Sequence, residues 1–144
     1  MYSNFIKLSL NLLLISVAGF SFSQTAENII FEKTTQKFMK VDEGHQVTLT
    51  YNFSYTGDSP ISIIPPKVDC TCTEVILPNE KISPKSTNVI KIKFDTKDKI
   101  GFQERQVAIH FVSDKMDSKS IEKKLIFKGM VKASKKTKAT YKKH

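Results

Sequence analysis

The stretch Val47-Thr48-Leu49-Thr50-Tyr51-Asn52-Phe53-Ser54-Tyr55 has the clearest pattern in the chain. Apolar and aromatic side chains occupy every second position, and small polar side chains stand between them. Because successive side chains of a strand point to opposite faces, this pattern predicts a β-strand with one buried face and one face in water. The turn residues Gly57-Asp58-Ser59-Pro60 then end the strand.

Further extended segments are expected on both sides of this strand. Pro65 and Pro66 interrupt one of them, because proline cannot donate a hydrogen bond to a neighbouring strand. About seven short strands, with turns between them and no helical period, predict an all-β fold, an immunoglobulin-like antiparallel β-sandwich. The expected strands are 28–31, 47–55, 61–64, 68–75, 89–94, 105–113 and 121–131, with a further short extended piece at 38–41.

The chain of 144 residues, 40% hydrophobic and 26% charged, suits one domain, which we place at 24–131. Residues 1–23 have the features of a signal peptide: Lys7, an apolar run at 8–20 and small residues at 21–23. A membrane-spanning helix needs about 20 apolar residues, so we expect cleavage near Gln24 and no transmembrane span afterwards. The sequence therefore predicts export to the periplasm or the cell exterior.

The C-terminal segment 132–144 contains six lysines and no acidic residue, within a chain whose net charge is +9. Such dense like charge predicts a disordered tail. Its simplest role is to keep the protein soluble, and the alternative is weak contact with an anionic surface. The segment has neither arginines, which bind phosphates and bases through two nitrogens, nor a series of aromatic side chains interleaved with its lysines, which would stack on bases. No specific nucleic acid is therefore expected.

Both cysteines of the chain lie in Cys70-Thr71-Cys72. Three states are considered: two thiols packed as small apolar groups, a local disulfide, or a Cu(I) site. Residues two apart on a strand have Cα atoms about 6.6 to 6.8 Å apart, whereas a disulfide prefers about 5.5 to 6 Å. A disulfide would therefore require a turn or bulge at Thr71, without positive φ because threonine is β-branched. The candidate site, a motif or redox pair, comprises Cys70, Cys72 and Thr73.

No catalytic, cofactor-binding or metal-binding residues are assigned, since no known nucleophile, zinc or phosphate-loop motif is present. His45 and His110 lack ligand spacing to the cysteines. The leading hypothesis is a non-enzymatic exported module whose edge strands or end loops bind or scaffold another envelope or secreted protein. The alternative is a thiol-redox or Cu(I)-binding protein that uses Cys70 and Cys72. A glycan-acting enzyme ranks last, because only the compartment favours it.

Several short motifs resemble a secreted family of unknown function, domain of unknown function 1573, over about residues 30–113. The family's glycines are replaced by Thr71 between the cysteines and by Lys85 after the Ile-x-Pro turn, and Tyr55 replaces an asparagine. The resemblance implies an immunoglobulin-like or major-sperm-protein-like sandwich and brings no established activity or cofactor. The matching motifs are Phe31-Glu32-Lys33-Thr34, Phe38 with Val41, Glu43 and Gly44, Pro60-Ile61-Ser62-Ile63, Cys70-Thr71-Cys72-Thr73, Ile82-Ser83-Pro84, Phe94-Asp95-Thr96 and Gly101-Phe102.

Overall fold

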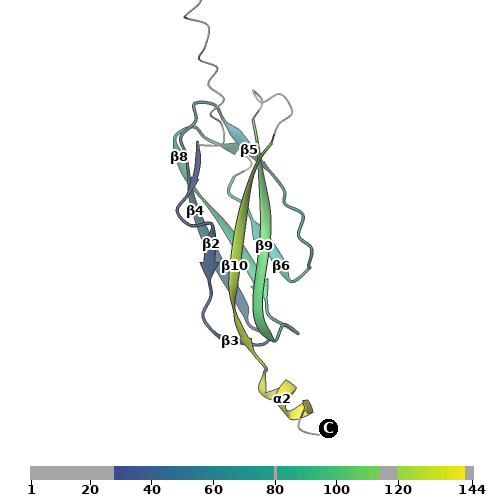
Figure 1. The fold of residues 1–144 in the computed structure, drawn as a ribbon. Helices are drawn as coiled ribbons and strands as arrows, with labels where there is room; N and C mark the ends of the chain where they lie inside the picture. Colours follow the sequence, from purple (N-terminus) through teal and green to yellow (C-terminus); the bar gives the residue numbers. More distant parts are fainter. Residues whose placement is uncertain (1–27, 80, 114–119, 142–144) are drawn as a thin grey trace, which may run out of the picture.

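The computed structural model describes residues 28–79, 81–113 and 120–141, so the predicted signal peptide at 1–23 lies outside the described residues. Strands dominate the described part of the chain, and one short helix follows them near the C-terminus (Figure 1). The elements are β1 (Ile29–Phe31), β2 (Thr35–Lys37), β3 (Val41–Asp42), β4 (Gln46–Tyr55), β5 (Ile61–Ile64), β6 (Thr73–Ile76), β7 (Lys81–Ile82), β8 (Ser86–Asp95), β9 (Gly101–Val112), β10 (Ile121–Lys132) and α2 (Lys135–Tyr141).

The strands form two sheets. One has the order β1-β4-β8-β6, and the other has the order β2-β10-β9-β5-β7, with β3 also paired to β10. The pairs are antiparallel except those that β10 makes with β2 and β3, which are parallel. The predicted immunoglobulin-like sandwich is therefore confirmed. Strand β1 lies near one end of the sandwich and α2 at the other, so the described chain enters and leaves at opposite ends (Figure 1).

The core lies between the two sheets and uses the alternate positions that the sequence predicted. Leu49, Phe53, Ile92 and Ile109 are each at most 4% exposed. Phenylalanine rings join the sheets, with centroids 5.5 Å apart for Phe53 and Phe111 and 5.2 Å apart for Phe94 and Phe127. Burying such side chains contributes about 1.5 to 3 kcal/mol each, so this alternation is the main source of stability. The other core residues, also buried, are Ile29, Tyr51, Tyr55, Ile61, Ile82, Ile90, Val107, Leu125 and Val131.

Two strand predictions need correction. The expected strand at 68–75 begins only at Thr73, because Pro65-Pro66 interrupts the ladder and residues 71–72 form a turn. The expected piece at 38–41 is replaced by β2 and the two-residue β3, and β2 lies in a stretch too polar to signal a strand. Backbone bonds hold it to β10: Ile126 N donates to Thr34 O at 2.8 Å.

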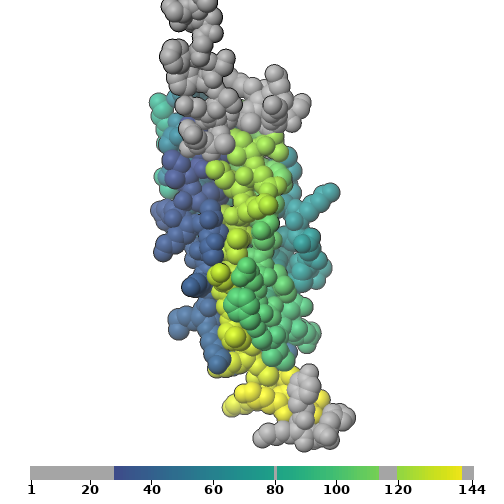
Figure 2. Space-filling model, in the orientation of Figure 1, coloured from purple at the N-terminus to yellow at the C-terminus, as the bar shows by residue number. Residues whose placement is uncertain are grey.

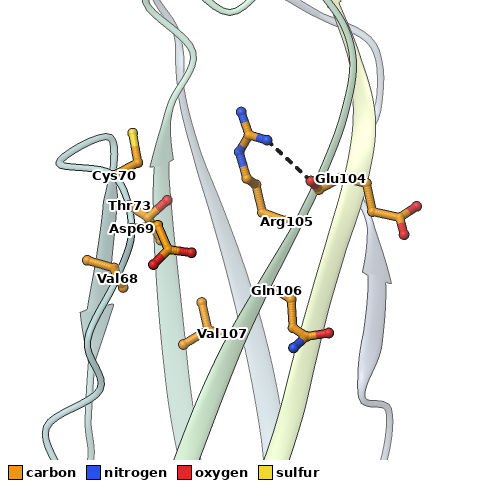
Figure 3. A pocket seen from close by; sticks show the side chains of 8 residues that line it. All are labelled: Val68, Asp69, Cys70, Thr73, Glu104, Arg105, Gln106 and Val107. Atoms are coloured by element: carbon orange, nitrogen blue, oxygen red, sulfur yellow. Dashed lines mark hydrogen bonds between the residues drawn. The ribbon is translucent and has the colours of Figure 1, made fainter.

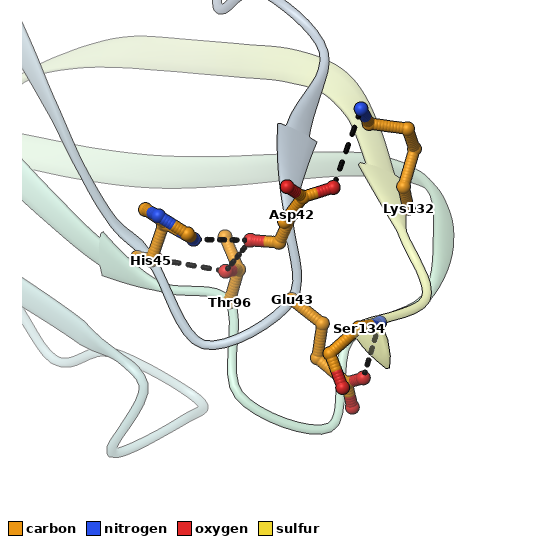
Figure 4. Close-up of polar contacts among 6 residues, drawn as sticks. All are labelled: Asp42, Glu43, His45, Thr96, Lys132 and Ser134. Carbon is orange, nitrogen blue, oxygen red and sulfur yellow. Dashed lines mark hydrogen bonds and ion pairs between the residues drawn. The ribbon is translucent and has the colours of Figure 1, made fainter. Parts of the chain in front are cut away.

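The turn between β3 and β4 is fixed by polar contacts (Figure 4). Gly44 has φ +87°, a left-handed conformation that glycine adopts without steric cost. The hydroxyl of Thr96, which is fully buried, donates to His45 O at 2.7 Å. Asp42 pairs with Lys132 at 3.2 Å, which links the turn to the end of β10. The turn therefore connects both sheets at this end of the molecule.

The predicted disorder of 132–144 is wrong for the residues that form the end of β10 and helix α2. Ser134 caps the helix, because its Oγ accepts a hydrogen bond from Thr137 N at 3.2 Å. Glu43 accepts bonds from Ser134 N, at 3.2 Å, and from the Thr137 hydroxyl. These bonds, that of Thr137 first, lower the pKa of Glu43. A cap and a carboxylate at its N-terminus thus compensate for the repulsion between lysines.

Candidate functional site

Cys70 and Cys72 form a disulfide across a tight turn that directly precedes β6. Their Cα atoms are 5.1 Å apart, closer than two alternate residues of a strand. Thr73 N donates to Cys70 O at 3.1 Å, which closes the turn. Among the described residues that are not glycine, only Lys85 and Asp98 have positive φ, so Thr71 turns the chain without it. The disulfide alternative, with its predicted turn at Thr71, is confirmed, and the two-thiol alternative is wrong for this structure.

Thr73 lies beside the disulfide and is the first residue of β6. It is buried, and its Oγ1 is 3.9 Å from Cys72 Sγ. Cys72 O accepts a hydrogen bond from Asp95 N at 2.8 Å, which ties the turn to the end of β8. The structure therefore places the three predicted site residues together in one corner that is bonded to β8.

This arrangement gives no support to the Cu(I) alternative. The two sulfurs are bonded to each other, so neither is a thiolate that could bind a metal. In the described ranges, no group of three or more His, Cys, Asp and Glu side chains is placed to hold a metal ion. His45 lies at the β3–β4 turn, and His110 lies 3.7 Å from Glu122 on β10.

A cleft of about 310 Å³ lies between the segment that carries the disulfide and strand β9. Figure 3 shows its two walls facing each other, with the Arg105 side chain rising into the space between them. The first wall includes Cys70 and belongs to the connection from β5 to β6, and the second is part of β9. The lining residues are Val68, Asp69, Cys70, Thr73, Glu104, Arg105, Gln106 and Val107.

Arg105 is the residue of this cleft that sequence reasoning missed. Its Nη2 donates to Gln103 Oε1 at 3.1 Å, and its Nη1 donates to Glu104 O at 3.4 Å. Within the described chain, no carboxylate lies within ion-pair distance of its guanidinium. The signal was present, since the alternation of Val107, Ile109 and Phe111 places Arg105 on the inward face of the strand.

The outer face of β9 and β10 has an exposed apolar pair. Phe102 is 61% exposed and Met130 is 41% exposed, and the register places them opposite each other. Figure 2 shows this side of the molecule, with β10 in yellow-green between β9 and the N-terminal strands. Neighbouring positions are charged, and Lys128 pairs with Glu104 at 3.6 Å. The pair thus forms a small apolar patch with charged residues around it.

Lys85 shows how the chain replaces a glycine of the resembled family. It has φ +52°, so it adopts a left-handed conformation although a side chain is present. The Nζ of Lys85 is 3.3 Å from Asp58 Oδ1, and both side chains are largely exposed. Such an exposed pair adds little stability, so the strain of the left-handed residue is not offset by it.

None of the helices in the described ranges is long and apolar enough to cross a membrane.

The comparisons with known proteins agree with this architecture. Residues 29–131 match the family described as "Protein of unknown function (DUF1573)". No curated protein matches the sequence.

Three solved structures share the fold at low sequence identity. A PapD-like domain of human CEP192 has a TM-score of 0.62 and 9% identity, over 83% of this chain and 97% of that domain. The periplasmic chaperone SfaE has a TM-score of 0.53 and 11% identity, over 72% of this chain and 57% of the chaperone. The VesB protease of Vibrio cholerae has a TM-score of 0.54 and 5% identity, over 72% of this chain and 32% of the protease.

Proposed function

The chain belongs to the DUF1573 family, whose function is unknown, and from that membership and the geometry above we propose that it is an exported, non-catalytic binding or scaffolding module. Its partner is another protein of the cell envelope or the secreted fraction. The PapD-like fold supports a role in binding, since one protein that shares this fold is a periplasmic chaperone.

The observation that carries this proposal is the exposed pair of Phe102 and Met130. The core does not need these side chains, because the inward positions of β9 and β10 are already filled by residues such as Val107 and Leu125. Removing two large apolar side chains from water on binding would contribute about 25 cal/mol for each Å² buried. The face therefore has a source of affinity that the fold alone leaves unused.

Two observations support export. A disulfide persists in oxidising compartments, and Cys70 and Cys72 form one. The segment 1–23 has the sequence features of a cleaved signal. Intact mass of the protein recovered from the producing cells, with and without reduction and alkylation, tests this. We expect an N-terminus near Gln24 and two alkylated thiols only after reduction, and an uncleaved chain with free thiols would contradict export.

The binding role is tested by affinity capture. The tagged protein, recovered from its native envelope, should retain a partner in stoichiometric amount. Phe102→Ser with Met130→Ser should lose that partner, whereas Val89→Ser, which removes an exposed apolar side chain from the other sheet, should keep it. A parent protein that captures no stoichiometric partner would contradict the binding role.

A second candidate function is thiol-disulfide exchange by Cys70 and Cys72. The observation in its favour is that both cysteines are only half-buried and Cys70 lines the cleft, so a small thiol can reach the bond. The test measures whether a glutathione buffer reduces the bond in the parent. The variant with Cys70→Ser and Cys72→Ser, which has no disulfide, serves as the blank. A disulfide that stays intact in that buffer would eliminate this candidate.

The lysines of the C-terminal segment provide a weak supplementary contact with anionic surfaces under this proposal. Lys135, Lys136 and Lys138 all belong to α2, which lies at one end of the sandwich (Figure 1). Such attraction is screened by salt, so binding to anionic vesicles should be lost as ionic strength rises. Vesicle binding that is unaffected by salt would contradict an electrostatic contact.

A further inference from the structure

Strand β9 is longer than the strand that covers its outer edge. It pairs with β10 over residues 101–111, but with β5 only at 110–112. Strand β5 ends at Ile64, since Pro65 and Pro66 cannot donate to the ladder. Over 101–109, β9 therefore has no second strand beside it among the residues that the structure describes.

The hydrogen bonds of β10 show which residues of β9 face this vacant side. Ile126 N bonds to Thr34 O, so the even-numbered residues of β10 direct their backbone groups toward β2. The odd-numbered residues, such as Phe127 opposite Arg105, must then bond to β9. The even-numbered residues of β9 consequently direct both backbone groups to the vacant side. We call these residues the open β9 edge: Phe102, Glu104, Gln106 and Ala108.

The open β9 edge is almost without hydrogen bonds. One bond to its backbone from a side chain is found among the described residues, the 3.4 Å bond from Arg105 Nη1 to Glu104 O. That bond is long, and its donor is a flexible side chain. From Phe102 to Ala108 the edge spans about 20 Å at the usual rise of a strand. This length accommodates an extended segment of about seven residues.

Arg105 shows that the sandwich itself is open beside this edge. Its position is on the inward face, yet the side chain is exposed, whereas the inward neighbours Gln103 and Val107 are buried. Across the gap lie Val68 and Cys70, on the other wall of the cleft of about 310 Å³. The cleft thus offers the apolar side chains of Val68 and Val107 and one guanidinium that is bonded only to uncharged oxygens. The carboxylates of Asp69 and Glu104 also line it.

We propose that the open β9 edge binds an extended segment of a partner protein, which adds an antiparallel strand in line with β5. The segment places a carboxylate side chain against Arg105 and a small apolar side chain against Val107 and Val68. Backbone hydrogen bonds to the edge supply affinity, and the two side-chain contacts supply selectivity. This inference rests on the proposed binding function. It adds to the exposed pair of Phe102 and Met130 a neighbouring site for the partner's backbone, and it specifies the chemistry of the segment that binds there.

The competing explanation is that the edge only faces water. An inward-pointing charge is one of the means by which proteins prevent strands from pairing with an edge, and Arg105 fits that description. The two explanations differ in a measurable way. A guarded edge repels every added strand, whereas a binding edge accepts one whose carboxylate neutralises Arg105.

The test uses a capped peptide with the sequence Thr-Val-Thr-Glu-Thr-Val-Thr and the exported chain with its disulfide intact. The central glutamate lies opposite Arg105 when the peptide covers the open β9 edge. Amide hydrogen exchange, followed by NMR, should show that the N–H groups of residues 102, 104, 106 and 108 exchange quickly in the free protein. The peptide should slow these four and leave 103, 105 and 107 unchanged, since those already bond to β10. No binding, or protection without this alternation, would overturn the proposal.

Matched controls separate backbone pairing from general adhesion. N-methylation of the third and fifth peptide residues removes donors to the edge and should abolish binding. The N–H groups of the second and sixth peptide residues point away from the edge, so N-methylation there should be tolerated. Arg105→Glu should weaken binding of the peptide by about tenfold or more, as expected for loss of a charge-assisted contact. Lys91→Glu, which makes the same charge change on an exposed position of β8, should bind normally.

The outcomes for the two proposals are distinguishable. If Arg105→Glu fails to fold, the exchange pattern of the parent protein still decides the question. If the parent captures a stoichiometric partner and Arg105→Glu captures it equally well, the binding function stands and the open β9 edge is not its site. If the parent captures no partner and binds no peptide, both proposals fail.

Discussion

Reduction of the Cys70–Cys72 disulfide should leave the fold intact and lower its free energy of unfolding only slightly. The bond joins residues with a sequence separation of 2, so the loop that it closes in the unfolded chain contains only residues 70–72. The loop-closure estimate for so short a loop is about 1.6 kcal/mol. The turn keeps two backbone bonds that need no sulfur, from Thr73 N to Cys70 O and from Asp95 N to Cys72 O.

The assay is urea unfolding of the oxidised protein, the reduced protein and the variant with Cys70→Ser and Cys72→Ser, followed by circular dichroism. Ile92→Ala provides the scale, because Ile92 is fully buried and its truncation should cost about 2 to 5 kcal/mol. The reductant should not change the midpoint of the double serine variant. A loss above about 3 kcal/mol on reduction would refute the reasoning, since it is the value for a loop of about 15 residues.

Three other substitutions test a buried hydrogen bond, a left-handed residue and a close contact in turn. Tyr51→Phe should cost about 0.5 to 1.5 kcal/mol at pH 7, because it removes the 2.8 Å bond to Ile126 O, as measured by urea unfolding. Burial raises the pKa of Tyr51, so the parent should lose stability above pH 10.0, the ordinary tyrosine value, and its advantage over Tyr51→Phe should shrink there. Lys85→Gly should raise the melting temperature, because glycine adopts the left-handed φ of +52° without strain, and an unchanged or lower value would contradict this. Gly129→Ala should cost about 1 to 3 kcal/mol, since the Phe38 ring occupies the place of the new methyl group, and a neutral result in the same assay would contradict that packing.

The sandwich could be predicted from the sequence because apolar side chains occupy every second position of the strands that form its core. The predicted strands 47–55 and 89–94 pair with each other, and the alternate apolar residues of both are buried. For Cys70 and Cys72 the sequence left three states open. Alternate residues of a regular strand are too far apart for a disulfide, so the sequence predicted only that a disulfide would require a turn at Thr71. Which state the chain adopts depends on the turn at Thr71, for which the sequence gives no decisive signal.

Other features were missed because backbone pairing, not side-chain pattern, produces them. Strand β2 has no apolar period and exists because β10 offers free donors and acceptors along its edge. Helix α2 depends on Glu43, which lies 91 positions before Ser134. The open β9 edge follows from Pro65-Pro66, which the sequence did show, but its position beside β9 depends on tertiary pairing.

The parallel pairing of β10 with β2 and β3 also determines how the module would respond to mechanical tension. The described chain enters near one end of the sandwich and leaves at the other, so a pull on both ends draws β2 and β10 in opposite directions along their lengths (Figure 1). The bonds between these strands, including Phe38 N to Lys128 O and Glu43 N to Lys132 O, would then be loaded in shear together and not one after another. A domain with this geometry should therefore resist stretching better than one whose terminal strands separate one bond at a time.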